Sequence, residues 1–266
     1  MGELRSDLVV WQSNWLVEAS QQMTLNEKRL VLAAAALHDP RKPLPPSATV
    51  KLHVMDFADV FGLQPKHVYE ALEEAAKRLF NRRIREIREG KRGRVIRDTR
   101  WVWMAEYNEG EATVTLGFSP TVVPYLTLLH QQFTRLKLRA IGSLGSFYGI
   151  RLYELFAQYL TIGERTIELP RLREMLGLSD KYADVKNLRV RVLDPAVDEI
   201  NKHTDLRVTM TPIRRGRTVT GFHFLIRVDA QMNLDFPIAD LLAALPATNN
   251  PPHDQLPSGA TVETTP

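Results

Sequence analysis

The 266-residue chain contains no cysteine, no apolar run as long as a membrane span and no phosphate-binding glycine loop. The missing cysteine excludes disulfides, thiolate catalysis and cysteine-based zinc sites. No apolar run approaches the roughly 18 residues that cross a membrane, and the first residues lack the apolar core of a signal peptide. Without a GxxxxGK(S/T) motif, an intrinsic ATPase is not expected. These absences predict a cytoplasmic protein with no membrane partner.

Catalytic arrangements are also scarce. The seven histidines are scattered, and no two of them have the spacing of the metal pair in a DNA-nicking enzyme. Tyr148 and Tyr153 have the chemistry of nicking nucleophiles, but without a metal pair we interpret them as packing residues. Adjacent carboxylates such as Glu73 and Glu74 point to different faces of a helix and build no metal site. We therefore expect no enzyme, no catalytic residue, no metal and no cofactor.

Charge is distributed unevenly along the chain. The formal net charge is +4, but residues 229–266 contain five carboxylates and no Lys or Arg, so residues 1–228 carry +9. A folded part this basic suggests a polyanionic partner, which can be DNA, RNA or an anionic membrane surface. The acidic segment is also rich in proline, and we expect 231–266 to be a flexible tail that is disordered after about Pro246.

Capping residues and hydrophobic spacing predict the helices of the first half. Thr24 and Glu27 match a capping box that begins a helix. Asp56 is expected to cap a short helix that Gly62 closes. The next helix begins at Pro65 and runs to about Asn81. Its core positions recur at three- and four-residue spacing: Val68, Leu72, Ala75, Ala76 and Leu79.

Strands are expected at 9–12, 50–54, 84–87, 95–107 and 112–118, with a further helix from Ser119 to about Phe133. A linker between two domains is expected near 134–144, where Gly142 and Gly145 follow this helix.

The second half has the order helix, strand, helix, turn, long helix and β-hairpin. A helix at 150–160 precedes the short strand TIEL, the helix PRLREML and the turn at Gly177. The amphipathic segment KNLRVRVLDPAVDEINKHT follows, with a kink or break expected at Asp194-Pro195. Two strands joined by the basic tip 214–217 complete a winged helix-turn-helix, which offers one helix to a major groove and a hairpin to the neighbouring backbone or minor groove.

The two halves repeat this plan. Residues 56–63 align with 169–178, and each long helix is followed by paired strands with a basic, glycine-containing tip at 91–94 or 214–217. We interpret this as a duplication of one winged-helix unit, the alternative being two unrelated α+β pieces. The predicted fold class is α+β, with tandem winged helix-turn-helix domains at 1–135 and 136–230.

The candidate DNA contacts are basic and amide side chains on these elements. Eleven Lys or Arg lie between Lys77 and Arg100; such a run is most often a solvated face, but its place on a hairpin favours phosphate contacts by Lys91, Arg92 and Arg94. In the second half, the first turns of the long helix and the wing carry a second set: Lys186, Asn187, Arg189, Arg191, Arg214, Arg215 and Arg217. Arginine and asparagine at the start of a recognition helix can contact base edges, although an exposed charged face is the alternative. The opposite stripe of this helix is expected in the core: Val185, Leu188, Val192, Leu193, Val197 and Ile200.

Several segments together resemble a known family. The segments IRLYELFAQYLTIGERTIELPRLREMLGL, DKYADVKNLRVRVLDPAVDEINKHTDLRV and PIRRGRTVTGFHF, with VVWQSNWLVEASQQMTLNEKRLVLAA before them, resemble the iteron-binding initiator proteins of theta-replicating bacterial plasmids. The resemblance covers roughly residues 9–228 and implies a plasmid-encoded protein of a bacterial cytoplasm. It also implies that the second winged helix is the main reader of origin direct repeats, and that the first supplies auxiliary DNA contacts and a dimer interface.

The resemblance implies further partners. Monomers of this family activate the origin, whereas homodimers in equilibrium with them bind an operator inverted repeat and repress the initiator's own promoter. The family opens the origin and recruits the host replication initiator and the replicative helicase. A transcription regulator with tandem winged-helix domains is the alternative function, and an RNA-processing or nicking enzyme is disfavoured by the missing motifs.

Overall fold

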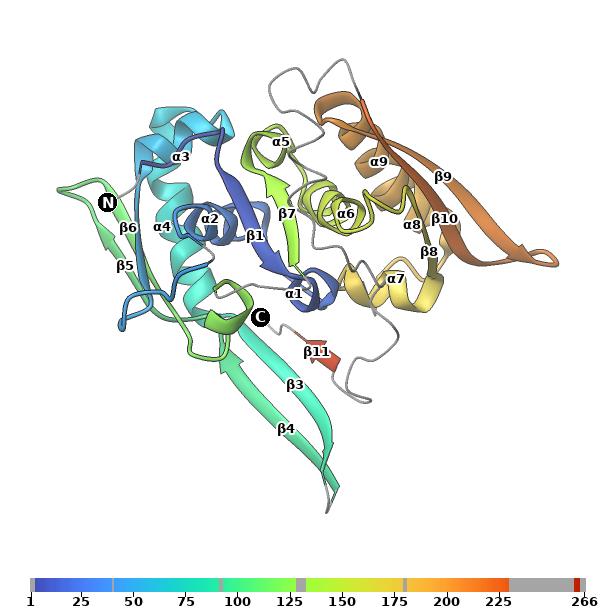
Figure 1. Cartoon of the computed structure of the whole chain (residues 1–266), viewed down its shortest axis with the longest axis horizontal. Coiled ribbons are helices and arrows are strands. Elements are labelled where there is room, and N and C mark those ends of the chain that lie inside the picture. The colour runs from blue at the N-terminus through green and yellow to red at the C-terminus, as the bar shows by residue number, and fades with distance from the viewer. Residues whose placement is uncertain are drawn as a thin grey trace.

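The computed structural model describes residues 3–39, 41–90, 93–127, 133–178, 181–229 and 261–263 (Figure 1). The expected flexible tail therefore lies outside the described residues, except for the strand β11 (Thr261–Glu263). The first half contains β1 (Val9–Ser13), α1 (Asn14–Glu18), α2 (Leu25–Ala36), β2 (Thr49–His53), α3 (Val54–Phe61), α4 (Pro65–Asn81), β3 (Arg83–Gly90), β4 (Gly93–Arg100), β5 (Val102–Asn108), β6 (Thr113–Phe118) and the 3-10 turn η1 (Val123–Tyr125).

The second half follows through β7 (Phe133–Lys137), α5 (Leu138–Gly142), α6 (Phe147–Ala157), β8 (Glu164–Glu168), α7 (Leu169–Met175), α8 (Val185–Leu188), the π-turn η2 (Arg189–Leu193), α9 (Asp194–His203), β9 (Leu206–Arg215) and β10 (Thr218–Val228). No helix among the described residues is long and apolar enough to cross a membrane.

The described part of the chain contains two units of the same topology. Each has a strand, a helix, a tight turn, a longer helix and a hairpin, and the three-stranded sheets have the orders β2-β6-β5 and β8-β10-β9. The turns after α3 and α7 are built alike, because Gly62 and Gly177 have left-handed φ values of 60° and 65°. At Gly177 a side chain would also meet the Gln21 carbonyl oxygen 2.6 Å away. The tandem winged-helix prediction is confirmed.

The prediction that the basic tips at 91–94 and 214–217 are equivalent wings of the two units is wrong. The hairpin of the first unit that corresponds to β9–β10 is β5–β6, because these strands occupy the same sheet positions. The β3–β4 hairpin with its basic tip is an insertion between α4 and β5, and it projects from the body of the molecule (Figure 1). The true wing tip of the first unit carries Glu109 and Glu111 instead of arginines, and Glu111 forms an ion pair with Lys51 on β2.

Three expected elements of the first half also differ. The strand predicted at 95–107 is split at Trp101, whose side chain is buried, into β4 and β5, which belong to two different sheets. The helix expected from Ser119 is only the turn η1 in the described part of that segment, since Pro124 lacks an N–H for a helical hydrogen bond. Asp56 is not a cap: α3 begins at Val54, directly after β2, and the Asp56 carboxylate accepts a hydrogen bond from the Leu4 amide.

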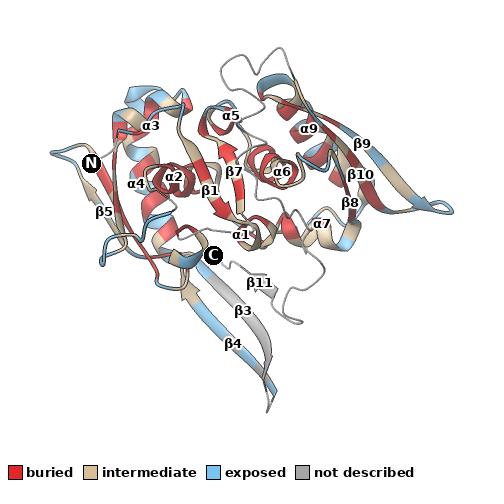
Figure 2. Ribbon diagram, in the orientation of Figure 1, coloured by how far each residue is buried: buried red, intermediate tan, exposed pale blue. Residues whose placement is uncertain are grey.

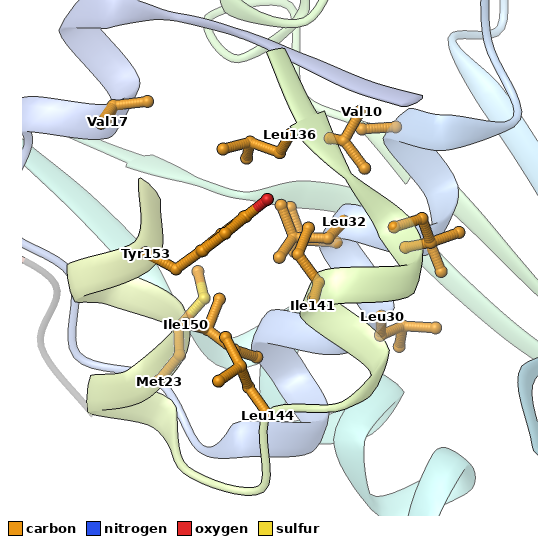
Figure 3. Packing of buried hydrophobic residues seen from close by; sticks show 14 of the residues in the cluster. Val10, Val17, Met23, Leu30, Leu32, Leu136, Ile141, Leu144, Ile150 and Tyr153 are labelled. Atoms are coloured by element: carbon orange, nitrogen blue, oxygen red, sulfur yellow. The ribbon is translucent and has the colours of Figure 1, made fainter. Parts of the chain in front are cut away.

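The expected linker is ordered secondary structure. Residues 133–142 form β7 and α5, and β7 pairs antiparallel with β1 from the other end of the first half. In Figure 3, Leu136 of β7, Leu32 of α2, and Ile150 and Tyr153 of α6 pack into one buried cluster. The two winged helices therefore share a continuous core in this structure (Figure 2).

The local predictions for helix starts and faces are confirmed. Thr24 and Glu27 form the reciprocal hydrogen bonds of a capping box at the start of α2. Pro65 occupies the first turn of α4, which ends at Asn81. All five predicted core positions of α4 are buried: Val68, Leu72, Ala75, Ala76 and Leu79.

A buried charged cluster joins the two units. The Glu154 carboxylate of α6 lies 2.7 Å from Lys28 Nζ of α2, accepts a 2.9 Å hydrogen bond from Gln12 Nε2 of β1 and pairs with Arg151. The Arg151 guanidinium also donates to the carbonyl oxygens of Val17 and of Met175 in α7. All three charged side chains are at most 1% exposed, so two cations share one carboxylate, and these polar groups solvate the remaining positive charge in place of water.

Candidate nucleic-acid interface

The long helix of the second unit is continuous but changes its winding. A helical turn of π type, η2, joins α8 to α9 just before Pro195, which has no N–H to continue the α-helical pattern. The kink or break predicted at Asp194-Pro195 is therefore a local π-helical turn within one continuous helix. Asp184 caps its start by accepting a 2.9 Å hydrogen bond from the Lys186 amide. Upstream, the Arg173 guanidinium donates to the carbonyl oxygens of Lys181 and Ala183, which ties α7 to the segment that leads into α8.

One face of this helix packs inward and the other is open. Five of the six predicted core residues are buried, namely Leu188, Val192, Leu193, Val197 and Ile200, whereas Val185 is half-buried. Lys186, Asn187 and Arg191 are exposed, so their side chains are accessible to a partner. The outward face of α8 and η2 also exposes Val190, which the sequence reasoning did not single out.

Arg189 is placed differently from Lys186, Asn187 and Arg191. Its guanidinium lies 3.3 Å from the Asp194 carboxylate across the π-turn, and its side chain is 41% exposed. The ion pair is exposed to solvent and therefore weak, so the Arg189 guanidinium can leave it to contact a ligand.

The wing is a long antiparallel hairpin with a basic tip. Strands β9 and β10 pair over their whole length, with one irregularity between Val219 and Gly221, and β10 also pairs with β8. Gly216 turns the tip with a φ of 62°, and Arg214, Arg215 and Arg217 around it are all exposed. Figure 1 shows the hairpin extending past the end of β8, and α9 packs against β9 at its base. The predicted basic wing is present.

The corresponding helix of the first unit, α4, exposes a less basic face. The exposed positions of α4 mix both signs of charge: Lys66, His67, Glu70, Glu73, Glu74, Lys77 and Arg78. Three carboxylates in the middle of this face would repel phosphates, whereas α8 and η2 expose no carboxylate between Asp184 and Asp194. The second unit therefore presents the more favourable surface for a polyanion.

Part of the basic run between Lys77 and Arg100 is used inside the protein. Arg82 pairs with the buried Glu27 at 2.8 Å, and Arg100 donates to the Phe80 carbonyl oxygen and stacks on the Phe80 ring. Lys91 and Arg92 at the tip lie outside the described residues. Arg94 lies on β4 opposite Glu89, and its side chain is not described.

The described residues contain no group of three or more His, Asp or Glu that could hold a metal ion. Tyr153 is buried, its hydroxyl lies 3.3 Å from Asp205, and burial raises the pKa of the phenol well above its usual value. Burial likewise raises the pKa of Tyr148. Tyr153 belongs to the buried core and Tyr148 packs against it, in agreement with a packing role.

The fold and this surface define a protein with tandem winged helices, in which the second unit exposes a basic helix face and a basic wing. Residues 9–157 match the family model described as initiator replication protein, WH1, and residues 168–226 match that described as initiator Rep protein, WH2. The chain belongs to the family of initiator replication proteins, and the alternative of a transcription regulator is not favoured.

Individual relatives agree with this assignment. A replication initiation protein of Escherichia coli is 27% identical over 237 residues, which cover 86% of this chain and 72% of the relative. The PI protein of Escherichia coli is 25% identical over 248 residues, which cover 81% of each chain. The crystal structure of the Pi initiator protein in complex with iteron DNA matches with a TM-score of 0.71 at 24% identity, over 85% of this chain and 99% of that chain, and it supports the fold.

Proposed function

We propose that this protein starts the replication of a plasmid by binding direct repeats, the iterons, in the origin. The observation that carries the proposal is the open basic face of α8 and η2 beside a basic wing, in a chain of the initiator family. The solved relative with the same fold was crystallised with iteron DNA, which supports the same class of ligand here. The second winged helix would read the repeat in the major groove, while the wing would contact phosphates.

Direct repeats of about 20 base pairs beside the gene are the expected target, since two winged helices cover about two turns of duplex. In a titration followed by gel shift, we expect a duplex with one such repeat to bind at least about 1,000-fold more tightly than a scrambled duplex of the same composition. Equal affinity for both duplexes would refute the initiator proposal.

The residues proposed to contact DNA are Lys186, Asn187, Arg189, Arg191, Arg214, Arg215 and Arg217 in the second unit, and Lys91, Arg92 and Arg94 in the inserted hairpin. In this division, residues 136–230 contain the main reader, and residues 1–135 supply auxiliary DNA contacts and the dimer interface. The mixed charge of the exposed α4 face supports this order of importance.

The remaining roles are those that the resemblance to the family implies. We propose that monomers bind the origin repeats, that a homodimer binds an operator inverted repeat and represses the promoter, and that the bound protein opens the origin and recruits the host initiator and helicase in the bacterial cytoplasm. No catalysis or cofactor is required, because binding and bending would open the duplex and the recruited helicase would unwind it.

Arg191→Ala and Arg189→Ala are each expected to weaken binding to the repeat by about 1–3 kcal/mol, because each removes a guanidinium that can contact a base. The exposed Lys202, near the end of α9, provides a matched control: Lys202→Ala removes a charge outside the proposed contact set and should retain most of the affinity. Unchanged affinity of Arg191→Ala in the same gel-shift titration would remove Arg191 from the reader, and the same holds separately for Arg189.

A further inference from the structure

Val190 is the most exposed of the large hydrophobic side chains in the described part of the chain. It is 60% exposed, compared with 39% for Met55 and 49% for Trp103. The winding of the helix explains this position. Leu188, Val192 and Leu193 take the inward face of α8 and η2, which leaves Val190 on the outward face.

The neighbours of Val190 distinguish it from an ordinary exposed valine. Single exposed apolar residues are common on protein surfaces and by themselves indicate nothing. Here, however, Lys186 lies four residues before Val190 on the same face, and Asn187 and Arg191 form the adjacent pair with the same spacing. The open face thus combines two cations, one amide and one branched apolar group.

That combination matches the chemistry of a major groove. The edges of the bases offer hydrogen-bond donors and acceptors, which suit Asn187 and Arg191, and one apolar group, the C5 methyl of thymine. A protein partner that packed on Val190 would have to desolvate the surrounding cations or pair them with carboxylates. The groove supplies phosphates for the cations and a methyl group for the valine at the same time.

We propose that Val190 determines part of the sequence specificity by packing against the C5 methyl group of a thymine in the bound repeat. The inference rests on the proposed function, since it requires α8 and η2 to lie in the major groove of the repeat. It adds an apolar contact to the basic and amide residues already assigned to this helix.

Deoxyuridine tests the contact, because it differs from thymidine only by the missing methyl group. In duplexes with one bound repeat, each thymine is replaced in turn by uracil and the dissociation constant is measured by gel shift. For the unchanged protein, we expect one position, or two adjacent ones, at which the replacement weakens binding by about fourfold, the worth of burying one methyl group.

Substitutions at Val190 then assign that effect. Val190→Ala should bind thymine and uracil equally at the sensitive position, whereas Val190→Thr keeps one methyl group in the same place and should retain the preference for thymine. Ile162, which is 45% exposed in the turn before β8, provides a control: Ile162→Ala should leave the whole uracil profile unchanged.

The outcomes separate the two proposals. If the repeat and a scrambled duplex bind equally, the proposed function fails. If the repeat binds specifically but no uracil weakens binding, or if Val190→Ala keeps the full preference for thymine, the assignment of Val190 is overturned while the function stands.

Discussion

Replacing Glu154 by glutamine is expected to lower the free energy of unfolding by about 3–5 kcal/mol, because it leaves two buried cations without an anion. Glu154 is the only carboxylate within ion-pair distance of Lys28 and Arg151 among the residues that the structure describes, and it is fully buried. Glutamine has nearly the same shape, so the loss reports on charge and not on a cavity. Urea denaturation followed by circular dichroism measures it.

The exposed face of α4 offers a matched control for this substitution. Glu73→Gln removes the same charge at an exposed position and should change the free energy of unfolding by no more than about 0.5 kcal/mol. Equal denaturation midpoints for Glu154→Gln and Glu73→Gln would show that the buried cluster does not stabilise the joined units.

The loss of stability caused by Glu154→Gln is expected to change with pH in a defined direction. Burial lowers the pKa of Lys28 to about 8 from its usual 10.5, and the charge of Glu154 opposes that shift. Without this carboxylate the pKa of Lys28 falls further in the folded state, while the unfolded value is unchanged. The part of the deficit due to Lys28 is therefore complete only below the lowered pKa of the variant. It shrinks as the pH rises from there and is lost above about 8, where the lysine is neutral in both folded proteins.

Removing the three arginines of the wing is expected to flatten the dependence of DNA binding on salt. Each lost phosphate contact reduces the slope of log affinity against log salt concentration by about 0.9, so the triple alanine variant of Arg214, Arg215 and Arg217 should lose about 2.7 from the slope. Between about 50 and 200 mM salt, the unchanged protein should then lose about 40-fold more affinity than the variant. Titrations at several salt concentrations measure both slopes.

Lysine provides the control for the wing. The triple variant with lysine at these three positions keeps every charge and should keep the slope, because counterion release depends on charge and not on guanidinium geometry. A slope of the alanine variant equal to that of the unchanged protein would show that the wing does not contact phosphate. Since all three side chains are exposed at the tip of the hairpin, neither variant should unfold the protein.

Local chemistry accounts for what could be predicted. The capping box at Thr24, the first-turn Pro65 and the core face of α4 depend only on residues within a few positions of each other, and all three were predicted correctly. The same holds for Gly62 and Gly177, whose left-handed conformation favours glycine and marked the two copies of the winged helix.

Long-range pairing accounts for most of what was missed. The segment 133–142 ends at a glycine, and a second glycine follows at 145, which made it resemble a linker. Pairing with β1 makes its first part a strand, and burial against α2 orders the rest. Likewise, spacing along the chain made the basic hairpin at 91–94 resemble a wing. Only the sheet order β2-β6-β5 identifies β5–β6 as the wing of the first unit and β3–β4 as an insertion.

The sequence by itself determined the winged-helix plan, its duplication, the basic surface and the family. Each of these depends on the order of residues over short stretches or on composition, and both can be read directly from the sequence. The tertiary structure decided which side chains of the second helix are available. Across the π-turn before Pro195, Arg189 pairs with Asp194, and Val190 is exposed on the same open surface as Asn187 and Arg191. Helical spacing predicted the core stripe of this helix, but the π-turn and the ion pair across it depend on the surroundings of Pro195, which that spacing does not contain.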